Sequence, residues 1–354
     1  MKKICVLLIL ILPTFIYAAE YPYFMKSTKA LGMGNAHYTI SSDQYSAFYN
    51  PAGLAFNKDS RIDILNPQFD MGKNAMDFYR DAKDTDWESE SEIAKLIRDN
   101  IGEHQHAGLS LFPAYYNKNF MIGVFGNARL NAVPRNKVYP NIETEFFVDR
   151  GITAGFAGKF LNNNSLSLGA NVKLIERESL VETYTAADLA KDDFDQIVED
   201  DLESGTGILG DIGAIYEMKS LPMNPRLGAA VNNIGATDFG DAEDMKTTLT
   251  LSASISPQIL FFESDIVIDY VDVTKAYDQD DDLGKRIHVG AELRPSKLQF
   301  FSLRAGINQG YPTFGASLDF NILKIDYAYY TEEVGAYAGQ WDDERHMLQI
   351  TLGF

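Results

Sequence analysis

The final nine residues, His346 to Phe354, constrain the fold more than any other stretch of the chain. Leu348, Ile350 and Leu352 alternate with polar or small residues, so they and Phe354 lie on one face of a β-strand. A strand that ends at a free carboxylate frays unless a second neighbour pairs with it. Closing a sheet into a barrel supplies that second neighbour. The end of the chain therefore predicts a closed β-barrel.

The start of the chain has the pattern of a secretory signal peptide. A cationic start, Met1-Lys2-Lys3, precedes an unbroken apolar run at 4–12 and a stretch that ends in small residues. The apolar run is about half the roughly 20 residues that a membrane anchor needs, so an anchor is the weaker alternative. We expect a signal peptide at 1–19. The single cysteine lies inside it, which leaves a mature chain without disulfides.

Composition excludes some functions. The net charge is −19, and removal of Lys2 and Lys3 leaves 29 basic against 50 acidic residues, a balance of −21. A chain this acidic repels nucleic acid, which requires a basic surface. No later stretch has 18 consecutive apolar residues, but alternating strands dilute hydrophobicity by half, so a membrane barrel remains compatible with this composition.

Alternation marks fourteen strand-like runs after residue 59. In the clearest, 246–256, Leu249 and Leu251 oppose Thr250 and Ser252; the run 119–129 alternates poorly. Most runs have the length that a tilted strand needs to cross a bilayer. The runs are 60–70, 107–116, 119–129, 149–160, 165–176, 207–218, 226–234, 246–256, 263–272, 285–294, 299–308, 312–320, 322–331 and 345–354.

The connections between runs alternate between short and long. Short connections include 117–118, 161–164 and 295–298, whereas 71–106, 130–148 and 177–206 are among the long ones. Short periplasmic turns that alternate with long external loops are typical of outer-membrane barrels. We predict an all-β chain with a 14-stranded antiparallel transmembrane barrel at 60–354, an N-terminal extension at 20–59, and both termini in the periplasm. Two soluble β-sandwich domains are the alternative.

The N-terminal extension carries a family resemblance. The small residues of 30–36 and the segment Phe48-Tyr49-Asn50-Pro51-Ala52 resemble the hatch of the FadL-type outer-membrane superfamily, which includes long-chain fatty-acid transporters and PorV-type secretion components. The resemblance implies a 14-stranded barrel whose N-terminus folds back as an internal plug. The terminal strand likewise resembles the C-terminal signature of bacterial outer-membrane proteins, which makes Phe354 the expected membrane-assembly signal.

The residues expected to seat and gate the plug have physical roles. Glycines let the backbone turn tightly and approach the barrel wall, and an Asn before Pro favours a turn. A chance turn and a chance tetrapeptide are the alternatives. The predicted plug residues are Gly32, Gly34, Phe48, Asn50, Pro51 and Ala52.

Polar residues recur on the inward faces of the late strands. Charges of both signs occur on adjacent strands, which fits an ion network that holds the wall and seats the plug. A polar lining for the head group of a substrate is the alternative, and an unpaired charge would favour it. The lumen-facing polar set is Asp269, Arg286, His288, Glu292, Arg304, Lys324 and Asp326.

Two long loops contain apolar residues at helical spacing, at 91–102 and 186–202. Such helices either dock a hydrophobic ligand or cap the barrel rim. Two acidic runs, 238–244 and 278–282, lack the spacing of an EF-hand, so solvated loops or cation-bridged contacts with lipopolysaccharide are expected rather than a metal site.

Catalytic and cofactor signatures are lacking: no zinc-protease motif and no nucleophile elbow occurs. We therefore expect neither an enzyme nor a cofactor. The resemblance implies an outer-membrane channel for passive uptake of hydrophobic, fatty-acid-like molecules. The alternative is a PorV-like component that anchors or shuttles secreted proteins. The partners implied are outer-membrane lipid, lipopolysaccharide, a hydrophobic ligand, the barrel assembly machinery and, in the alternative, secreted proteins.

Overall fold

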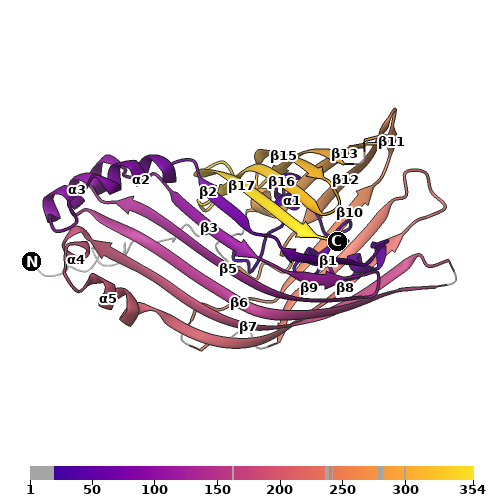
Figure 1. The fold of residues 1–354 in the computed structure, drawn as a ribbon, viewed down its shortest axis with the longest axis horizontal. Helices are drawn as coiled ribbons and strands as arrows, with labels where there is room; N and C mark the ends of the chain where they lie inside the picture. Colours follow the sequence, from indigo (N-terminus) through magenta and orange to yellow (C-terminus); the bar gives the residue numbers. More distant parts are fainter. Residues whose placement is uncertain (1–19, 162, 236–238, 241, 278–281, 299) are drawn as a thin grey trace, which may run out of the picture.

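The computed structural model describes residues 20–161, 163–235, 239–240, 242–277, 282–298 and 300–354. The predicted signal peptide, 1–19, lies outside the described residues, as do parts of both acidic runs. The chain forms one antiparallel sheet of 17 strands that curves into a barrel (Figure 1). None of the helices in the described part of the chain is both long and apolar enough to cross a membrane.

Seventeen strands make a barrel of fourteen. β1 and β2 are the two halves of one broken strand, and β3 and β4 are the two halves of the next. The two-residue β11 only extends the turn before β12, so the wall of the barrel has 14 strands. The bounds are β1 Arg61–Leu65, β2 Gln68–Gly72, β3 Gln105–Leu111, β4 Ala114–Tyr116, β5 Phe120–Arg135, β6 Asn141–Phe160, β7 Leu166–Thr185, β8 Glu203–Glu217, β9 Arg226–Gly235, β10 Thr248–Ile255, β11 Gln258–Ile259, β12 Phe262–Tyr270, β13 Ile287–Pro295, β14 Phe301–Asn308, β15 Tyr311–Asp319, β16 Leu323–Glu333 and β17 Asp342–Gly353.

The last strand closes the barrel, as the end of the sequence predicts. β17 pairs with β16 on one side and with β2 and β1 on the other. The two broken strands are interrupted side by side, at Pro67 and Pro113, because proline has no N–H to give to a ladder. Asn66 bridges the gap: its Nδ2 donates to the carbonyl of Phe112 at 2.5 Å, and its Oδ1 accepts from the amide of Phe112 at 2.7 Å. The wall is thereby continuous across the break.

Strands β5 to β8 are longer than predicted. They contain 15 to 20 residues each, against the 9–11 or so that cross a bilayer. The expected long loop at 130–148 is therefore wrong: β5 runs to Arg135 and β6 begins at Asn141. The poorly alternating run at 119–129 is in fact a strand with alternating burial. The apolar alternation in the sequence stops before these strands end, because their outward side chains become polar beyond the apolar band.

The apolar band has a visible upper edge on the outer surface. Arg150 of β6 forms two hydrogen bonds with Glu176 of β7, at 2.9 and 2.8 Å, and both side chains are about half exposed. Between this pair and the turn at 161–165, the outward side chains are apolar and exposed; among them are Ile152, Phe156 and Leu174. An exposed apolar belt of this kind faces lipid in a transmembrane barrel.

The helices of the long loops, α2 to α5, cluster at the barrel end opposite Phe354 (Figure 1). The predicted helix at 91–102 is α3 (Glu90–Asp99), and the one at 186–202 is two short helices, α4 (Ala186–Leu189) and α5 (Phe194–Asp201). α2 (Ala75–Lys83) was not predicted. Ile93 and Ile97 of α3 pack with Ile142 of β6 and Ala186 of α4. These contacts favour the rim-capping interpretation of that loop.

Candidate functional site: an N-terminal segment inside the barrel and a cavity beside it

Residues 20–59, the N-terminal segment, lie against the inward side chains of the barrel. The segment contains the short α1 (Thr28–Leu31) and two 3-10 helices, η1 (Gln44–Ala47) and η2 (Pro51–Phe56), and most of its side chains are buried. Wall side chains satisfy its irregular backbone, as a buried loop requires. The wall residues that bond to its backbone include Gln68, Asn171, Ser167, Asn232, Asp269, His288 and Thr313.

Asp269 of β12 is the clearest of these tethers. Its Oδ2 accepts from the backbone amides of His37 and Tyr38, at 2.6 and 3.1 Å. Next to it, Gly34 donates to the hydroxyl of Thr313 at 2.8 Å, and its carbonyl lies 3.0 Å from Nδ1 of His288. Two predicted lumen residues, Asp269 and His288, therefore bind the N-terminal segment directly.

Glycines of the wall let this segment approach at backbone distance. Gly290 and Gly306 face each other on β13 and β14, and a Cβ on either would overlap the backbone of Met33. Gly169 and Gly213 face each other on β7 and β8, where a Cβ would overlap the 50–52 turn. The two glycine pairs form two seats on different parts of the wall. Sequence reasoning placed the needed glycines in the segment and missed those in the wall.

Four of the six predicted plug residues lie at these seats: Gly34 at the first, and Asn50, Pro51 and Ala52 at the second. Gly34 has a φ of +66°, which favours glycine. Gly32 has a helical backbone, but a Cβ there would lie 2.9 Å from the Cα of Gly315. The Oδ1 of Asn50 accepts from the amide of Ala52 at 3.0 Å, with Pro51 at the first position of η2.

Phe48 packs against the wall outside both seats. Its ring meets Phe112 and Phe125 edge-on, with centroids 5.2 and 5.1 Å away.

Four predicted lumen residues form one ion network. Arg304 lies 2.9 Å from Glu292 and 3.5 Å from Asp326, and Lys324 lies 3.2 Å from Asp326. Lys29 of the N-terminal segment joins the network 3.4 Å from Glu292. This arrangement matches the interpretation in which charges hold the wall and seat the segment.

A second ion network was missed by sequence reasoning. Lys26 lies 2.7 Å from both Glu20 and Glu332, and Arg345 lies 2.9 Å from Glu20 and 2.6 Å from Asp343. Burial raises the pKa of Glu20, but the charges of Arg345 and Lys26 outweigh it and hold the pKa well below its usual range. Two of these pairs, Lys26 with Glu332 and Arg345 with Glu20, join residues more than 300 positions apart, so no local pattern predicts the network.

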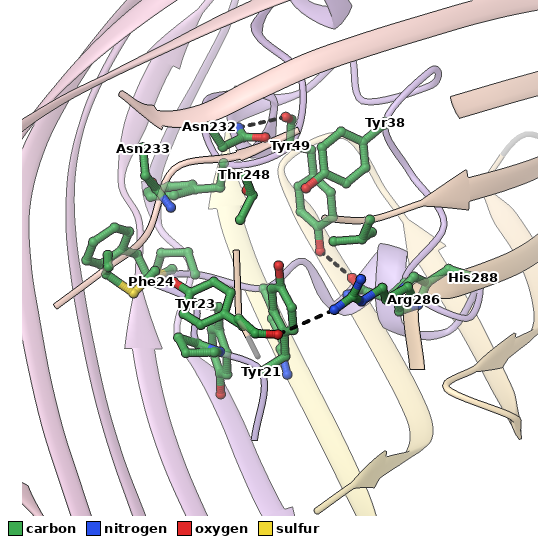
Figure 2. Close-up of a pocket in the computed structure, with 18 of the residues that line it drawn as sticks. Tyr21, Tyr23, Phe24, Tyr38, Tyr49, Asn232, Asn233, Thr248, Arg286 and His288 are labelled. Carbon is green, nitrogen blue, oxygen red and sulfur yellow. Dashed lines mark hydrogen bonds between the residues drawn. The ribbon is translucent and has the colours of Figure 1, made fainter. Parts of the chain in front are cut away.

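A cavity of about 90 Å³ lies between this second network and residues 48–49 of the N-terminal segment. Its lining combines tyrosine and phenylalanine rings with about as many polar or charged side chains (Figure 2). An apolar cavity of about 150 Å³ is known to hold benzene, so entry of one ring here requires some displacement of the lining. The lining residues labelled in Figure 2 are Tyr21, Tyr23, Phe24, Tyr38, Tyr49, Asn232, Asn233, Thr248, Arg286 and His288.

Arg286 lies in this lining, apart from both ion networks. It was predicted inside a strand and is instead the last residue of α6 (Leu283–Arg286), just before β13. Its side chain is 1% exposed, and its Nη2 donates to the carbonyl of Tyr277 at 3.4 Å. Its Nε and Nη1 have no hydrogen-bond partner among the described residues.

Comparison with known proteins identifies the fold. The family described as "F plasmid transfer operon, TraF, protein" matches residues 112–259, less than half of the chain, and no curated protein matches significantly. A mutant of the monoaromatic hydrocarbon channel TodX from Pseudomonas putida has a TM-score of 0.52 at 12% identity, over 92% of this chain and 97% of that one.

Two further solved structures agree. The toluene transporter TbuX of Ralstonia pickettii has a TM-score of 0.50 at 12% identity, over 92% of this chain and 96% of its own. A FadL homologue of Pseudomonas aeruginosa has a TM-score of 0.50 at 13% identity, over 95% of this chain and 99% of its own. The chain therefore has the fold of the FadL-type outer-membrane channels.

Proposed function

We propose that this protein is an outer-membrane channel for passive uptake of small hydrophobic molecules, and that its N-terminal segment is the plug. The observation that carries the proposal is a cavity lined by aromatic and polar side chains inside a closed barrel, next to a segment bound to the wall from both sides. The similar structures described as toluene transporters and as a FadL homologue support it. A buried cavity also favours transport over the PorV-like alternative, because anchoring a secreted protein needs none.

The proposed path starts at the helix-bearing end of the barrel, reaches the cavity, and continues once the plug shifts. Displacement is required because the cavity is smaller than one benzene-sized ligand needs. Hydrogen bonds, ion pairs and apolar packing hold the plug to the wall, and none of these contacts belongs to the barrel's own ladder, so the plug can move without breaking that ladder.

The proposal includes an orientation. The helices α2 to α5 face the cell exterior, and Phe354 and the start of β1 face the periplasm. The exposed charged edge at Arg150 and Glu176 then meets lipopolysaccharide, and the final strand is presented to the barrel assembly machinery during insertion. Glu20, the first described residue, lies in the lumen beside Arg345, near the start of β17.

Deletion of residues 20–59, with the signal sequence kept, tests the plug. We expect the barrel to assemble, because its ladder closes without the segment, and to conduct steadily in planar bilayers where the parent conducts poorly. Uptake of radiolabelled toluene into proteoliposomes tests transport in the parent. Equal conductance of parent and deletion would contradict the plug, and toluene uptake no faster than in empty liposomes would contradict the channel.

A milder variant tests gating while most of the plug stays in the barrel. Asn50→Ala with Pro51→Ala removes the cap and the fixed turn of η2 but keeps most of the plug. We expect unchanged amounts of heat-modifiable barrel and altered uptake of the probe. Arg150→Gln, on the outer surface, is the matched control and should change neither measurement.

A further inference from the structure

One half of the barrel end away from α2 to α5 presents an exposed apolar surface. Its side chains come from the three turns that link β10 to β12, β13 to β14, and β15 to β16 (Figure 1). Exposed apolar surface that is contiguous marks contact with a protein or a membrane. We call this surface the turn patch, and its members are Leu260, Phe261, Leu298, Phe300, Phe320 and Ile322.

The three turns lie side by side, so the turn patch is continuous. The amide of Ser296 donates to the carbonyl of Phe261 at 2.8 Å, which joins the first turn to the second. The amide of Asp319 donates to the carbonyl of Phe300 at 2.7 Å, which joins the second turn to the third. The rings of Phe300 and Phe320 stack across that junction, with centroids 6.0 Å apart.

The strands next to the turn patch are too short to span the apolar part of a membrane alone. β10, β12, β13, β14 and β15 contain 8 or 9 residues each. At a rise of about 3.3 Å per residue and a tilt of about 40°, such a strand covers roughly 20–23 Å of bilayer thickness. The apolar band of an outer-membrane barrel is about 25 Å tall, so the remainder must come from residues outside these strands.

The other half of the same barrel end shows the reverse combination. The lipid-facing part of β6, from Arg150 to Phe160, is about as long as the 9–11 residues that cross a bilayer. The turns here are polar: Asn-Lys-Asn at 117–119, and three successive asparagines at 162–164. The turn at 219–225, between the two halves, is mixed. Apolar turns therefore accompany the short strands, and polar turns accompany the long ones.

The turn patch is also continuous with the lipid-facing belt. Leu303 of β14 and Leu318 of β15 are exposed on the outer surface, and Phe300 and Phe320 adjoin the ends of the same two strands. We propose that the turn patch is embedded in the phospholipid of the nearer leaflet, where it completes the apolar band that the short strands leave unfinished. The polar turns of the other half lie in water. This inference requires that the barrel spans a membrane, and it does not depend on transport.

Site-directed spin labelling of the full-length barrel in phospholipid vesicles tests the inference. The only cysteine of the chain lies in the predicted signal peptide, so an introduced cysteine is labelled without background. The variants are Leu260→Cys and Phe320→Cys in the turn patch, Lys118→Cys in a polar turn, and Leu303→Cys in the belt. Collisions with oxygen, which concentrates in lipid, are compared with collisions with a water-soluble nickel chelate. We expect the oxygen-to-nickel ratio at both turn-patch sites to be several-fold above that at position 118 and close to that at position 303.

Bilayer thickness provides the second arm. Leu260→Ser combined with Phe320→Ser shortens the apolar band on one half of the barrel, and a shortened band is mismatched more severely in a thicker bilayer. We expect the double variant to lower the urea midpoint of unfolding more in vesicles of 18-carbon phosphatidylcholine than in vesicles of 12-carbon phosphatidylcholine. Lys118→Ser is the matched control and should change neither midpoint. Heat-modifiability checks assembly; if the double variant does not assemble, the spin labels decide alone.

The outcomes separate this inference from the proposed function. Nickel access at both turn-patch sites equal to that at position 118 places the turn patch in water and overturns the inference. Equal losses of the urea midpoint in thin and thick bilayers also overturn it, because they report lost packing within the protein rather than lost contact with lipid. Uptake of toluene into proteoliposomes tests the channel separately, and its failure leaves the spin-label result standing.

Discussion

The backbone of Phe354 exchanges two hydrogen bonds with Ile62: each amide donates to the other's carbonyl, at 2.9 and 2.8 Å. The last residue of the chain thus closes the barrel onto its first strand. Deletion of Phe354 removes this pair and shortens the closing strand, and two such bonds contribute about 1–3 kcal/mol. We expect reduced levels of heat-modifiable barrel in the membrane fraction. Phe354→Tyr keeps both backbone bonds and serves as the control; wild-type assembly of the deletion would count against this role.

The lipid-facing belt predicts a depth-dependent penalty for charge. Ile212 is 53% exposed. It pairs with Ala170, which in turn pairs with Phe156, so it lies about halfway between the charged edge and the opposite turn. Ile212→Arg should therefore cost about 2–4 kcal/mol of barrel stability. Leu130 also faces outward but lies beyond the charged edge, so Leu130→Arg should cost about 0–1 kcal/mol. Urea unfolding in detergent measures both, and equal penalties would place the belt elsewhere.

The glycine seats predict that one methyl group unseats the plug. A Cβ at Gly213 would overlap Oδ1 of Asn50, so Gly213→Ala forces the 50–52 turn away from the wall. Overpacking of this kind costs about 1–3 kcal/mol. Gly126 is a barrel glycine whose Cβ would meet nothing within 4 Å, so Gly126→Ala is the matched control. We expect raised single-channel conductance for Gly213→Ala alone; identical traces from the two variants would contradict the seat.

His37 makes plug seating depend on pH. The side chain is fully buried in the N-terminal segment, neither ring nitrogen has a hydrogen-bond partner within the described part of the chain, and burial lowers its pKa from 6.5 to about 4. The unseated plug binds a proton more readily, so seating is strongest above about pH 6.5 and weakens as pH falls towards 4. The full loss is on the order of 3 kcal/mol.

Conductance between pH 7.5 and pH 4 measures this dependence. The parent should begin to open below about pH 6.5, and His37→Gln should lack that step because it has no proton to gain. His346, on the outer face beside Tyr327, provides the control through His346→Gln, which should keep the parent's profile. An unchanged step in His37→Gln would assign the pH dependence to other groups.

The barrel could be predicted from the sequence because its signals are local. Alternation, turn residues and the terminal strand each depend on neighbours in the chain, and together they give the strand count and the closure. The extent of β5, β6 and β7 could not be predicted. Their outer halves lie beyond the apolar band, where outward residues such as Arg150 and Glu176 are polar and the alternation disappears.

The site could be predicted only where it depends on short-range chemistry. The turn at Asn50 and Pro51 follows from residue type alone, and so does the need for glycine at 34. The pairing of Lys26 with Glu332 depends on tertiary contact, because inward charges of both signs offered many equivalent partners. The same ambiguity concealed the position of Arg286, which lies apart from both ion networks.

The two glycine seats also set the order of assembly. One is built by β7 and β8 and the other by β13 and β14, so a half-formed barrel offers the N-terminal segment only one of them. The early strands can hold the 50–52 turn while the later strands are still being added, but the region around Met33 has no place until the sheet is nearly complete. We therefore expect the region around Met33 to dock late in folding, once β13 and β14 have joined the sheet.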